Sequence, residues 1–413
     1  MRIAIIGAGV SGLVAASQLH QKHDITLFEA GDSPGGHVRT INVEIDGASF
    51  DIDTGFVVFN NVRYPEFLRI IRRLGVETQL SDMSFSVSCN KTGIEYAGTS
   101  VNGLFAQRRN IMRPTFLRLL ADYLRFNRRA RDGLNFDERE TLGEFLDRSD
   151  FSRVFRDLYL VPMGAAIWSA VDRQIELMPV NTFVRFFDNH GLLRVWNRPQ
   201  WRSIRGGSRR YVEALIQPFR DRIHLQTPAT RVWRDRAGAH ITLEGHGETT
   251  YDHVVFATHS DQALRILDDP TPDERRVLGA IGFQENDVVV HTDRTLLPRN
   301  RRAWAAWNYR IPESNGDRVQ ITYNMNRLQC LAAPQTFCVT LNQTEHINPA
   351  RVITQLTYHH PVLNQDAIRA QKHWPRISGR RSTSYAGAYW NYGFHEDGVL
   401  SGIRVAQELR HFE

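Results

Sequence analysis

Residues 2–12 read Arg2-Ile3-Ala4-Ile5-Ile6-Gly7-Ala8-Gly9-Val10-Ser11-Gly12 and decide the fold. An apolar run of strand length leads into three glycines in the pattern G-x-G-x-x-G, and a stretch with helical character follows. A second apolar run then ends in the acidic Glu29, about twenty residues further on. This order of strand, glycine turn, helix and acidic residue predicts a dinucleotide-binding βαβ unit.

Each residue of this fingerprint has an expected role. Gly7 allows the tight turn, Gly9 lets the backbone approach a pyrophosphate, and Gly12 allows the helix to pack closely on the strand. The helix N-terminus offers free N–H groups and a positive dipole to the phosphates. Glu29 is expected to accept hydrogen bonds from the ribose hydroxyls. The cofactor contacts predicted in this block are Gly7, Gly9, Ser11, Gly12, Glu29 and Ala30.

A second glycine pair indicates which dinucleotide is bound. Gly35 and Gly36 are followed by His37, Val38 and Arg39, a stretch that a domain binding only NAD does not need. It resembles the GG-x-x-R/T stretch of the flavin-containing amine oxidase superfamily, in which backbone amides and an arginine reach the FAD pyrophosphate. The resemblance implies FAD as the cofactor, with Arg39 as a bidentate phosphate ligand. His37 stands where the family often has an arginine, and we assign it no role.

Further blocks of the same superfamily follow in the expected order. Residues 53–56 resemble its D-x-G strand end, and residues 205–209 precede a helix and the strands that carry Val232, whose counterpart lies by the adenine. Residues 385–402 resemble the A-G-(D/E) strand end and the helix start that holds the flavin, with Asp397 in place of a glycine. The additional cofactor residues that this resemblance implies are Thr54, Gly55, Gly207, Val232, Gly387, Asp397, Gly398 and Val399. No cysteine or histidine lies at a clear flavin-attachment motif, so non-covalent FAD is expected.

The spacing of these blocks predicts an α/β protein with two interleaved domains. Residues 1–60, 200–262 and 376–413 are expected to form a Rossmann-like FAD-binding domain of the glutathione-reductase/amine-oxidase type. Residues 61–199 and 263–375 are expected to form an α+β substrate domain. A chain of 413 residues is long enough for two substantial cores.

Composition bears on localisation and metal binding. Three cysteines without paired spacing indicate a reduced, cytoplasmic setting, and we expect them to be buried apolar filler. No stretch is apolar for long enough to span a membrane, and the N-terminal run is interrupted by glycines, unlike a signal peptide. The histidines are scattered without H-x-x-H or C-x-x-C spacing, so no metal site is expected.

A basic amphipathic helix is predicted within residues 108–131. Eight arginines crowd this segment, apolar residues recur at helical spacing from Phe116 to Leu124, and Pro114 stands at a plausible first position. One interpretation is an ordinary helix that packs its apolar face inward. The other is docking on an anionic membrane surface at the inner face of the membrane. Nucleic acid is not an expected partner, since no nucleic-acid-binding module accompanies the basic run.

The scarcity of lysine bears on the chemistry. Many amine oxidases of the superfamily carry a lysine that holds a water against the flavin, at the start of a strand whose counterpart here looks like residues 283–290. The only lysines are Lys22, Lys91 and Lys372, and none falls in that strand. The superfamily scaffold is therefore present without clear support for amine oxidation.

A closer resemblance covers nearly the whole chain. The sequence is similar to a bacterial family of amine-oxidase-like FAD proteins associated with cyclopropane and methylated (furan) fatty acid biosynthesis. The stretches that carry the resemblance are residues 53–60, 82–88, 103–110, 159–169, 358–361 and 387–398. Members are typically encoded beside methyltransferases, and one relative is implicated in desaturating a methylated acyl chain. The resemblance implies a small lipid substrate and a pathway methyltransferase as a partner.

Candidate catalytic residues lie just ahead of the flavin-facing helix. Phe394 matches a substrate-side aromatic position of the superfamily, and the polar candidates are His395 and Glu396. His395 is equally compatible with a structural hydrogen bond that orients the helix start. Tyr392 completes the set of candidates, which is Tyr392, Phe394, His395 and Glu396. His359-His360 is expected to pack or to line a cavity wall.

Three hypotheses follow from these observations. The first is a fatty-acyl oxidoreductase that desaturates its substrate by hydride transfer to flavin N5, or a flavin-assisted double-bond isomerase. The second is an amine oxidase, and the third is a non-catalytic lipid-binding flavoprotein. The first predicts an elongated apolar cavity that ends at the flavin and is lined in part by the aromatic-rich segments 183–196 and 389–394.

Overall fold

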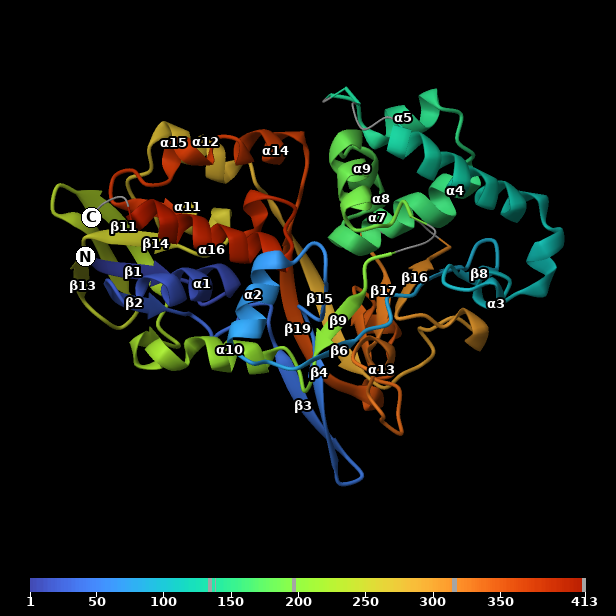
Figure 1. Cartoon of the computed structure of the whole chain (residues 1–413), viewed down its shortest axis with the longest axis horizontal. Helices are drawn as coiled ribbons and strands as arrows, with labels where there is room; N and C mark the ends of the chain where they lie inside the picture. Colours follow the sequence, from blue (N-terminus) through green and yellow to red (C-terminus); the bar gives the residue numbers. More distant parts are fainter. Residues whose placement is uncertain (133–135, 138, 195–197, 314–317, 411–413) are drawn as a thin grey trace.

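The computed structural model describes residues 1–132, 136–137, 139–194, 198–313 and 318–410. Figure 1 shows two lobes, with the earliest and the latest elements of the chain together in the left lobe and long strands between the lobes.

A five-stranded parallel sheet forms the centre of the left lobe. Its order is β10 (Ile223–His224), β2 (Asp24–Phe28), β1 (Arg2–Ile6), β14 (His253–Phe256) and β20 (Thr383–Tyr385). β1 is apolar and buried beyond its first residue, as expected for a strand covered on both faces. The strands predicted at residues 2–6 and 25–28 are therefore confirmed, and so is the mixed α/β class.

Helices cover this sheet, and α1 (Val10–Leu19) packs along α16 (His395–Leu409). The other helices of the lobe are α2 (Pro65–Arg73), α10 (Arg209–Ile216), α11 (Ser260–Ile266), α12 (Pro272–Gly279), α14 (Gln365–Gln371) and α15 (Trp374–Ile377). An antiparallel meander of β11 (Ala229–Asp235), β12 (Gly238–Leu243) and β13 (Glu248–Tyr251) leads back into β14.

A seven-stranded sheet carries the second lobe. Its order is β19 (Val352–Pro361), β15 (Phe283–His291), β18 (Cys338–Leu341), β17 (Ile321–Asn324), β16 (Trp307–Ile311), β7 (Phe85–Cys89) and β8 (Ile94–Ala97). β15 confirms the strand predicted at residues 283–290. It pairs with β19 along its whole length, from Phe283 opposite Pro361 to His291 opposite Val352. Figure 1 shows these two strands running between the lobes.

Helices stand over one side of this sheet in the right lobe (Figure 1). They are α3 (Val101–Leu104), α4 (Pro114–Asp132), α5 (Leu142–Arg148), α6 (Arg153–Phe155), α7 (Val161–Trp168), α8 (Asp172–Glu176) and α9 (Val180–Asn189). The basic helix predicted within 108–131 is α4, and it begins at Pro114 as expected. Arg108–Met112 forms a separate 3₁₀ turn ahead of it.

Small sheets link the lobes. They are β3 (Thr40–Ile45) with β4 (Ala48–Asp53), and β5 (Val58–Asn60), β9 (Trp201–Ile204) and β6 (Thr78–Leu80), while α13 (Met325–Leu328) follows β17. Two large clusters of buried apolar side chains match the lobes, and Phe67, Ile70 and Ile71 of α2 belong to the first one, with the parallel sheet. The domain boundaries drawn from the sequence stay a prediction.

The cysteines depart in part from the expectation. Cys89 and Cys338 are buried, whereas Cys330 is exposed because it lies in a turn after α13, with a left-handed backbone (φ 49°). Among the residues that the structure describes, no helix is both long and apolar enough to cross a bilayer.

Candidate functional site

One cavity of about 1550 Å³ runs from the glycine turn after β1 into the helical lobe. Ligand pockets in proteins usually measure about 300–1,000 Å³, so this volume exceeds what one small ligand needs. Both its glycine-rich end and its apolar end are lined by segments far apart in the sequence. It therefore offers room for a dinucleotide and a second molecule.

The glycines of the first turn lie as a dinucleotide site requires. Gly7 has φ +105°, and a Cβ on Gly12 would lie 2.1 Å from the Gly7 carbonyl oxygen, so α1 packs closely on the turn. Gly9 differs, since a Cβ built there meets no atom within 4 Å and would extend into the cavity. The protein thus leaves open the place where a pyrophosphate would pass.

Glu29 and the start of α1 supply the polar groups of this end. Gly9 caps α1 without a side-chain hydrogen bond, so the first N–H groups of the helix stay available to an anion. The Glu29 carboxylate accepts one hydrogen bond on each oxygen, from the N–H of Ala8 (2.7 Å) and of Gly31 (2.8 Å). Each oxygen keeps a lone pair for a hydroxyl. These residues fit the adenosine diphosphate part of FAD.

The second glycine pair adjoins the first turn. The Gly35 N–H donates to the Ala8 carbonyl (2.8 Å), and a Cβ on Gly36 would lie 3.1 Å from the Gly9 Cα. Arg39 is not among the lining residues; its side chain is 46% exposed and lies 4.0 Å from Asp32. Its role as a phosphate ligand stays a prediction.

Asp53, Thr54 and Gly55 bring the end of β4 to the cavity. The buried Asp53 carboxylate accepts hydrogen bonds from Thr40 Oγ1 (2.6 Å), Ser208 N (2.8 Å) and Gln329 Nε2 (3.1 Å). Burial raises the pKa of Asp53 to about 7, while the hydrogen bonds from Thr40 and Ser208 oppose the shift. This carboxylate thus ties the parallel-sheet lobe to α13 of the other lobe.

Helix α16 meets α1 at two glycines and begins at the cavity. A Cβ on Gly398 would lie 2.6 Å from Val10 Cγ1, and one on Gly402 would lie 2.5 Å from the Ser11 carbonyl oxygen. Asp397 accepts hydrogen bonds from Asn391 Nδ2 (2.7 Å) and the Phe394 N–H (2.9 Å). The side chain that replaces the family's glycine therefore closes the turn that leads into the helix.

Glu396 has a different role from the one expected of it. It is buried, it is not among the cavity-lining residues, and its two oxygens accept the N–H groups of Glu66 and Phe67, both at 2.9 Å. Glu396 therefore caps the start of α2. A side chain one position along a helix points about 100° away from its neighbour, which is why His395 reaches the cavity and Glu396 does not.

Many of the predicted site residues line the cavity, and the others lie outside its lining. Those that line it are Gly7, Gly9, Ser11, Glu29, Ala30, Gly35, Gly36, Thr54, Gly55, Gly387, Tyr392, Phe394 and His395. Those outside the lining are Gly12, Arg39, Gly207, Val232, Glu396, Asp397, Gly398 and Val399. Val232 is fully buried in the core, and Pro228 and Ala229 line the cavity on the same segment instead.

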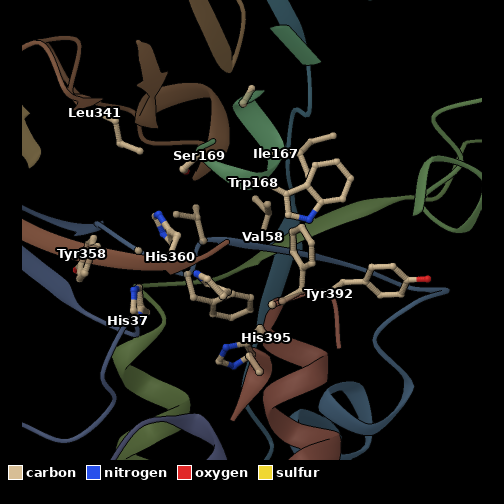
Figure 2. A pocket seen from close by; sticks show the side chains of 18 of the residues that line it. His37, Val58, Ile167, Trp168, Ser169, Leu341, Tyr358, His360, Tyr392 and His395 are labelled. Carbon is tan, nitrogen blue, oxygen red and sulfur yellow. The ribbon is translucent and has the colours of Figure 1, made fainter. Parts of the chain in front are cut away.

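His395 is held by two neighbours at the junction of the two ends. Its Nε2 lies 2.8 Å from the Tyr211 hydroxyl, and its ring stacks on Phe56 at 3.6 Å between centroids. Burial lowers the pKa of His395 to about 3, so the imidazole is neutral at neutral pH. Figure 2 shows His395 on one side of the pocket, across from Ile167, Trp168 and Ser169 at the end of α7.

The two aromatic-rich segments meet next to His395. Phe394 stacks on Phe186 of α9 (4.8 Å), Tyr392 lies 5.8 Å from the same ring, and His190 stacks on it at 3.9 Å. The cavity lining expected from segments 183–196 and 389–394 is thus confirmed, except that residues 195–196 lie outside the described part of the chain.

A histidine cluster lies on the opposite flank, at the left of Figure 2; the sequence predicted His360 at a cavity wall but gave His37 no role and did not single out His259. His37 stacks on Tyr358 (4.7 Å) and lies 5.6 Å from His360 and 6.4 Å from His259. All four residues line the cavity. Burial lowers the pKa of His37 to about 4 and of His360 to about 3, so this flank is neutral. Little in the sequence indicated this cluster, because its residues come from segments far apart in the chain.

The strand that the resemblance assigns to a flavin-facing lysine carries Asn286 here. Its Nδ2 donates to His360 Nδ1 (3.0 Å), which leaves the proton of that imidazole on Nε2.

The far end of the cavity is apolar. Side chains of α4 and α7 line it, together with residues of the seven-stranded sheet; those of α4 and α7 are Leu119, Leu120, Tyr123, Leu124, Met163, Ala166, Ile167 and Trp168. Among the described lining residues the carboxylates are Glu29 and Asp53, which belong to the glycine-rich end and the lobe junction. A cationic amine would find no carboxylate partner at the apolar end. In the described part of the chain, no group of three acidic, histidine or cysteine side chains is arranged to hold a metal ion.

Comparison with known sequences identifies related proteins. A profile of flavin-containing amine oxidoreductases matches residues 10–320. Over 74 residues, 18% of this chain and 14% of the relative, the sequence is 38% identical to a zeta-carotene-forming phytoene desaturase of Myxococcus xanthus. The matched segments span less than two thirds of the curated relatives' own lengths.

Solved structures share the architecture over the whole chain. A fatty acid isomerase from P. acnes that produces CLA superimposes with a TM-score of 0.69 at 17% identity, covering 98% of each chain. Cyclohexylamine oxidase from Brevibacterium oxydans IH-35A superimposes with a TM-score of 0.71 at 15% identity, covering 99% of each chain. At these identities the likeness shows the fold.

Proposed function

The chain belongs to the flavin-containing amine oxidoreductase family, and we propose that it oxidises a hydrophobic acyl chain rather than an amine. The observation that carries this proposal is the apolar end of the cavity, whose described lining includes no carboxylate and no lysine. An acyl chain needs apolar walls and few polar partners. The proposed substrate is a fatty-acyl or phospholipid-linked chain, methylated as the sequence resemblance implies.

FAD fits the glycine-rich end of the cavity. The open space beside Gly9, the free N-terminus of α1 and the unused lone pairs of Glu29 suit its pyrophosphate and ribose. Bound FAD supplies a two-electron acceptor for a hydride at N5, and the protein supplies orientation and electrostatics.

The protein's own residues position the chain and exclude water. Trp168, Phe186 and Phe394 form an aromatic wall beside His395, against which an acyl chain can lie. In a desaturation one carbon loses a hydride and its neighbour loses a proton. The neutral imidazole of His395 lines the cavity beside this wall, and it is the proposed proton acceptor.

The proposal is tested with purified holoenzyme under anaerobic conditions. Phospholipids carrying monounsaturated and methyl-branched acyl chains should bleach the flavin absorbance and give a product lacking two hydrogens, read by mass spectrometry. Aromatic amines and polyamines should not bleach it. Bleaching by amines alone would support amine oxidation, whereas the absence of both flavin reduction and a changed lipid product with either class would leave a non-catalytic flavoprotein. Lipid profiles of cells with and without the gene would then identify the chain.

A second candidate is double-bond isomerisation. It is favoured by the shared fold with a fatty acid isomerase over nearly the full length of both chains. Isomerisation moves a double bond without net oxidation, so it needs no electron acceptor in stoichiometric amounts. Measuring acceptor consumption per product molecule separates the two: one equivalent indicates desaturation, and none indicates isomerisation.

A further inference from the structure

Large apolar side chains gather on the surface of the helical lobe. Val101 is 75% exposed, Met112 82% and Leu124 59%, and Ile111 and Leu117 are also exposed. Single exposed apolar residues are ordinary, but a group on one surface marks a contact with a partner or a membrane. These five residues come from α3, the 3₁₀ turn Arg108–Met112 and α4. We call the surface that these three elements form the apical surface.

The elements of the apical surface pack against one another. Phe105, directly after α3, contacts Phe116 of α4 (6.0 Å), and the 3₁₀ turn runs into the start of α4. Leu117, Ala121 and Leu124 follow one another on the outer face of α4, where a surface helix normally carries polar residues. Figure 1 shows α3 and α4 at the end of the molecule opposite the parallel sheet.

The apical surface is also strongly basic. Residues 101–131 contain eight arginines and a single carboxylate, Asp122. Asp122 is buried and pairs with Arg118 (3.2 Å) and Arg125 (3.1 Å), so it presents no negative charge to a partner. Arg108 and Arg109 are exposed beside Ile111 and Met112. Arg108 donates to the Phe105 carbonyl (2.9 Å) and to Asn102 Oδ1 (2.6 Å), and Arg109 donates to the Gly93 carbonyl (3.3 Å), yet both side chains stay open to solvent. Apolar side chains flanked by arginines complement an anionic lipid surface.

Not all arginines of the segment belong to this surface. Arg125 lies over the ring of Phe151 at 4.4 Å and donates to the Asp150 carbonyl, and Arg129 donates to the Ser149 carbonyl (3.2 Å). These two side chains hold α4 against the turn that follows α5.

The cavity opens on the apical surface. Val101 and Leu124, which are largely exposed, both line the cavity, together with the exposed Arg198. The apolar end of the cavity is therefore continuous with the outer surface between α3 and α4. A chain that enters here can pass toward the aromatic wall without crossing the glycine-rich end.

We propose that the apical surface docks on an anionic lipid bilayer, with Ile111, Met112 and Leu117 inserted among the acyl chains and the arginines at the headgroups. The mouth between Val101 and Leu124 then faces the hydrocarbon. This docking rests on the surface alone, and only the entry of a substrate from the membrane rests on the proposed function.

The test is co-sedimentation with vesicles of phosphatidylglycerol or of phosphatidylcholine. The wild-type protein should bind phosphatidylglycerol vesicles preferentially, and more weakly as salt rises. The double variant Ile111→Asp/Met112→Asp should lose at least roughly tenfold in partitioning, and Arg108→Gln/Arg109→Gln should lose a similar factor on phosphatidylglycerol only. The matched control is Leu177→Asp, at an apolar residue of the same lobe that is 52% exposed, and it should bind like the wild type.

Flavin content and thermal unfolding show whether each variant is folded. Equal partitioning of wild type and Ile111→Asp/Met112→Asp overturns the proposal. No vesicle binding by the wild type also overturns it and leaves a protein partner as the occupant. Vesicle binding requires no turnover, so its loss is distinguishable from a failure of the proposed chemistry. Turnover of a short soluble acyl analogue should survive in the folded variants.

Discussion

His395 lies flat against Phe56, with 3.6 Å between the ring centroids and 11° between the ring planes. The two residues come from opposite ends of the chain, one after β4 and the other at the first position of α16. The Tyr211 hydroxyl completes the arrangement at 2.8 Å from Nε2. Three separate segments therefore fix one neutral imidazole on the cavity lining.

Tyr211→Phe should lower turnover without emptying the cofactor site. The variant keeps the ring but removes one hydrogen bond, which costs about 1 kcal/mol in the free energy of unfolding. His395 then loses its orientation. Tyr385→Phe is the matched control, because it removes a buried hydroxyl that donates to Glu274 (2.7 Å) away from the cavity lining. Equal turnover in the two variants would show that the Tyr211 contact is only structural.

Gly9→Val should fold but contain little FAD. A Cβ there meets no protein atom within 4 Å and the backbone conformation is ordinary, so the valine side chain would enter the space where a pyrophosphate would pass. Flavin absorbance per protein and thermal unfolding measure the two effects. Gly247→Val, also in open space, should keep its flavin, whereas Gly12→Ala should lose roughly 1–3 kcal/mol of stability through its clash with Gly7. Full flavin content in Gly9→Val would contradict the cofactor site.

Acid precipitation should release all of the flavin from the native protein. None of the three cysteines lies on the described lining of the cavity, so no thiol is placed for a flavin bond. The supernatant should contain free FAD by absorbance and mass. Flavin that stays with the precipitate would show a covalent link, for which a cavity-lining histidine would be the next candidate.

Glu396→Ala should lower the stability of the fold but leave the turnover rate unchanged. Its carboxylate caps the N-terminus of α2, and removal of such a cap costs about 0.5–2 kcal/mol. Turnover per bound flavin should equal that of the wild type. Thr141→Ala, which removes the side-chain cap of α5, should show a similar loss on thermal unfolding. A drop in turnover at unchanged stability would return Glu396 to the catalytic candidates.

The buried histidines should cost the protein stability as the pH falls from about 6.5 toward 4, while the raised pKa of Asp53 acts in the opposite direction. Burial lowers the pKa of His37 and His259 to about 4, below the ordinary value of 6.5. Between these pH values the unfolded chain binds protons that the folded chain does not. The free energy of unfolding therefore decreases as the pH is lowered. His37→Gln should flatten this slope in denaturant titrations between pH 7 and pH 4.5. An unchanged slope would contradict burial of a neutral His37.

The sequence by itself determined the features that local pattern controls. The apolar run, the glycines and the acidic residue of the first unit specify strand, turn and helix within residues 2–29. The helix start at Pro114 follows from local rules of the same kind, whereas the strand at residues 283–290 was identified through the superfamily resemblance. The cofactor class followed from sequence blocks that each act close to their own position in the chain.

Only the tertiary structure decided which side chains meet. His37, His259 and His360 form one cluster because a loop, the start of α11 and the end of β19 converge, and no local period signals such a contact. Glu396 is a cap rather than a cavity residue because α2 packs on α16. The basic segment divides into structural and surface arginines for the same reason: partners distant in the chain, not helical spacing, set which face of α4 is free.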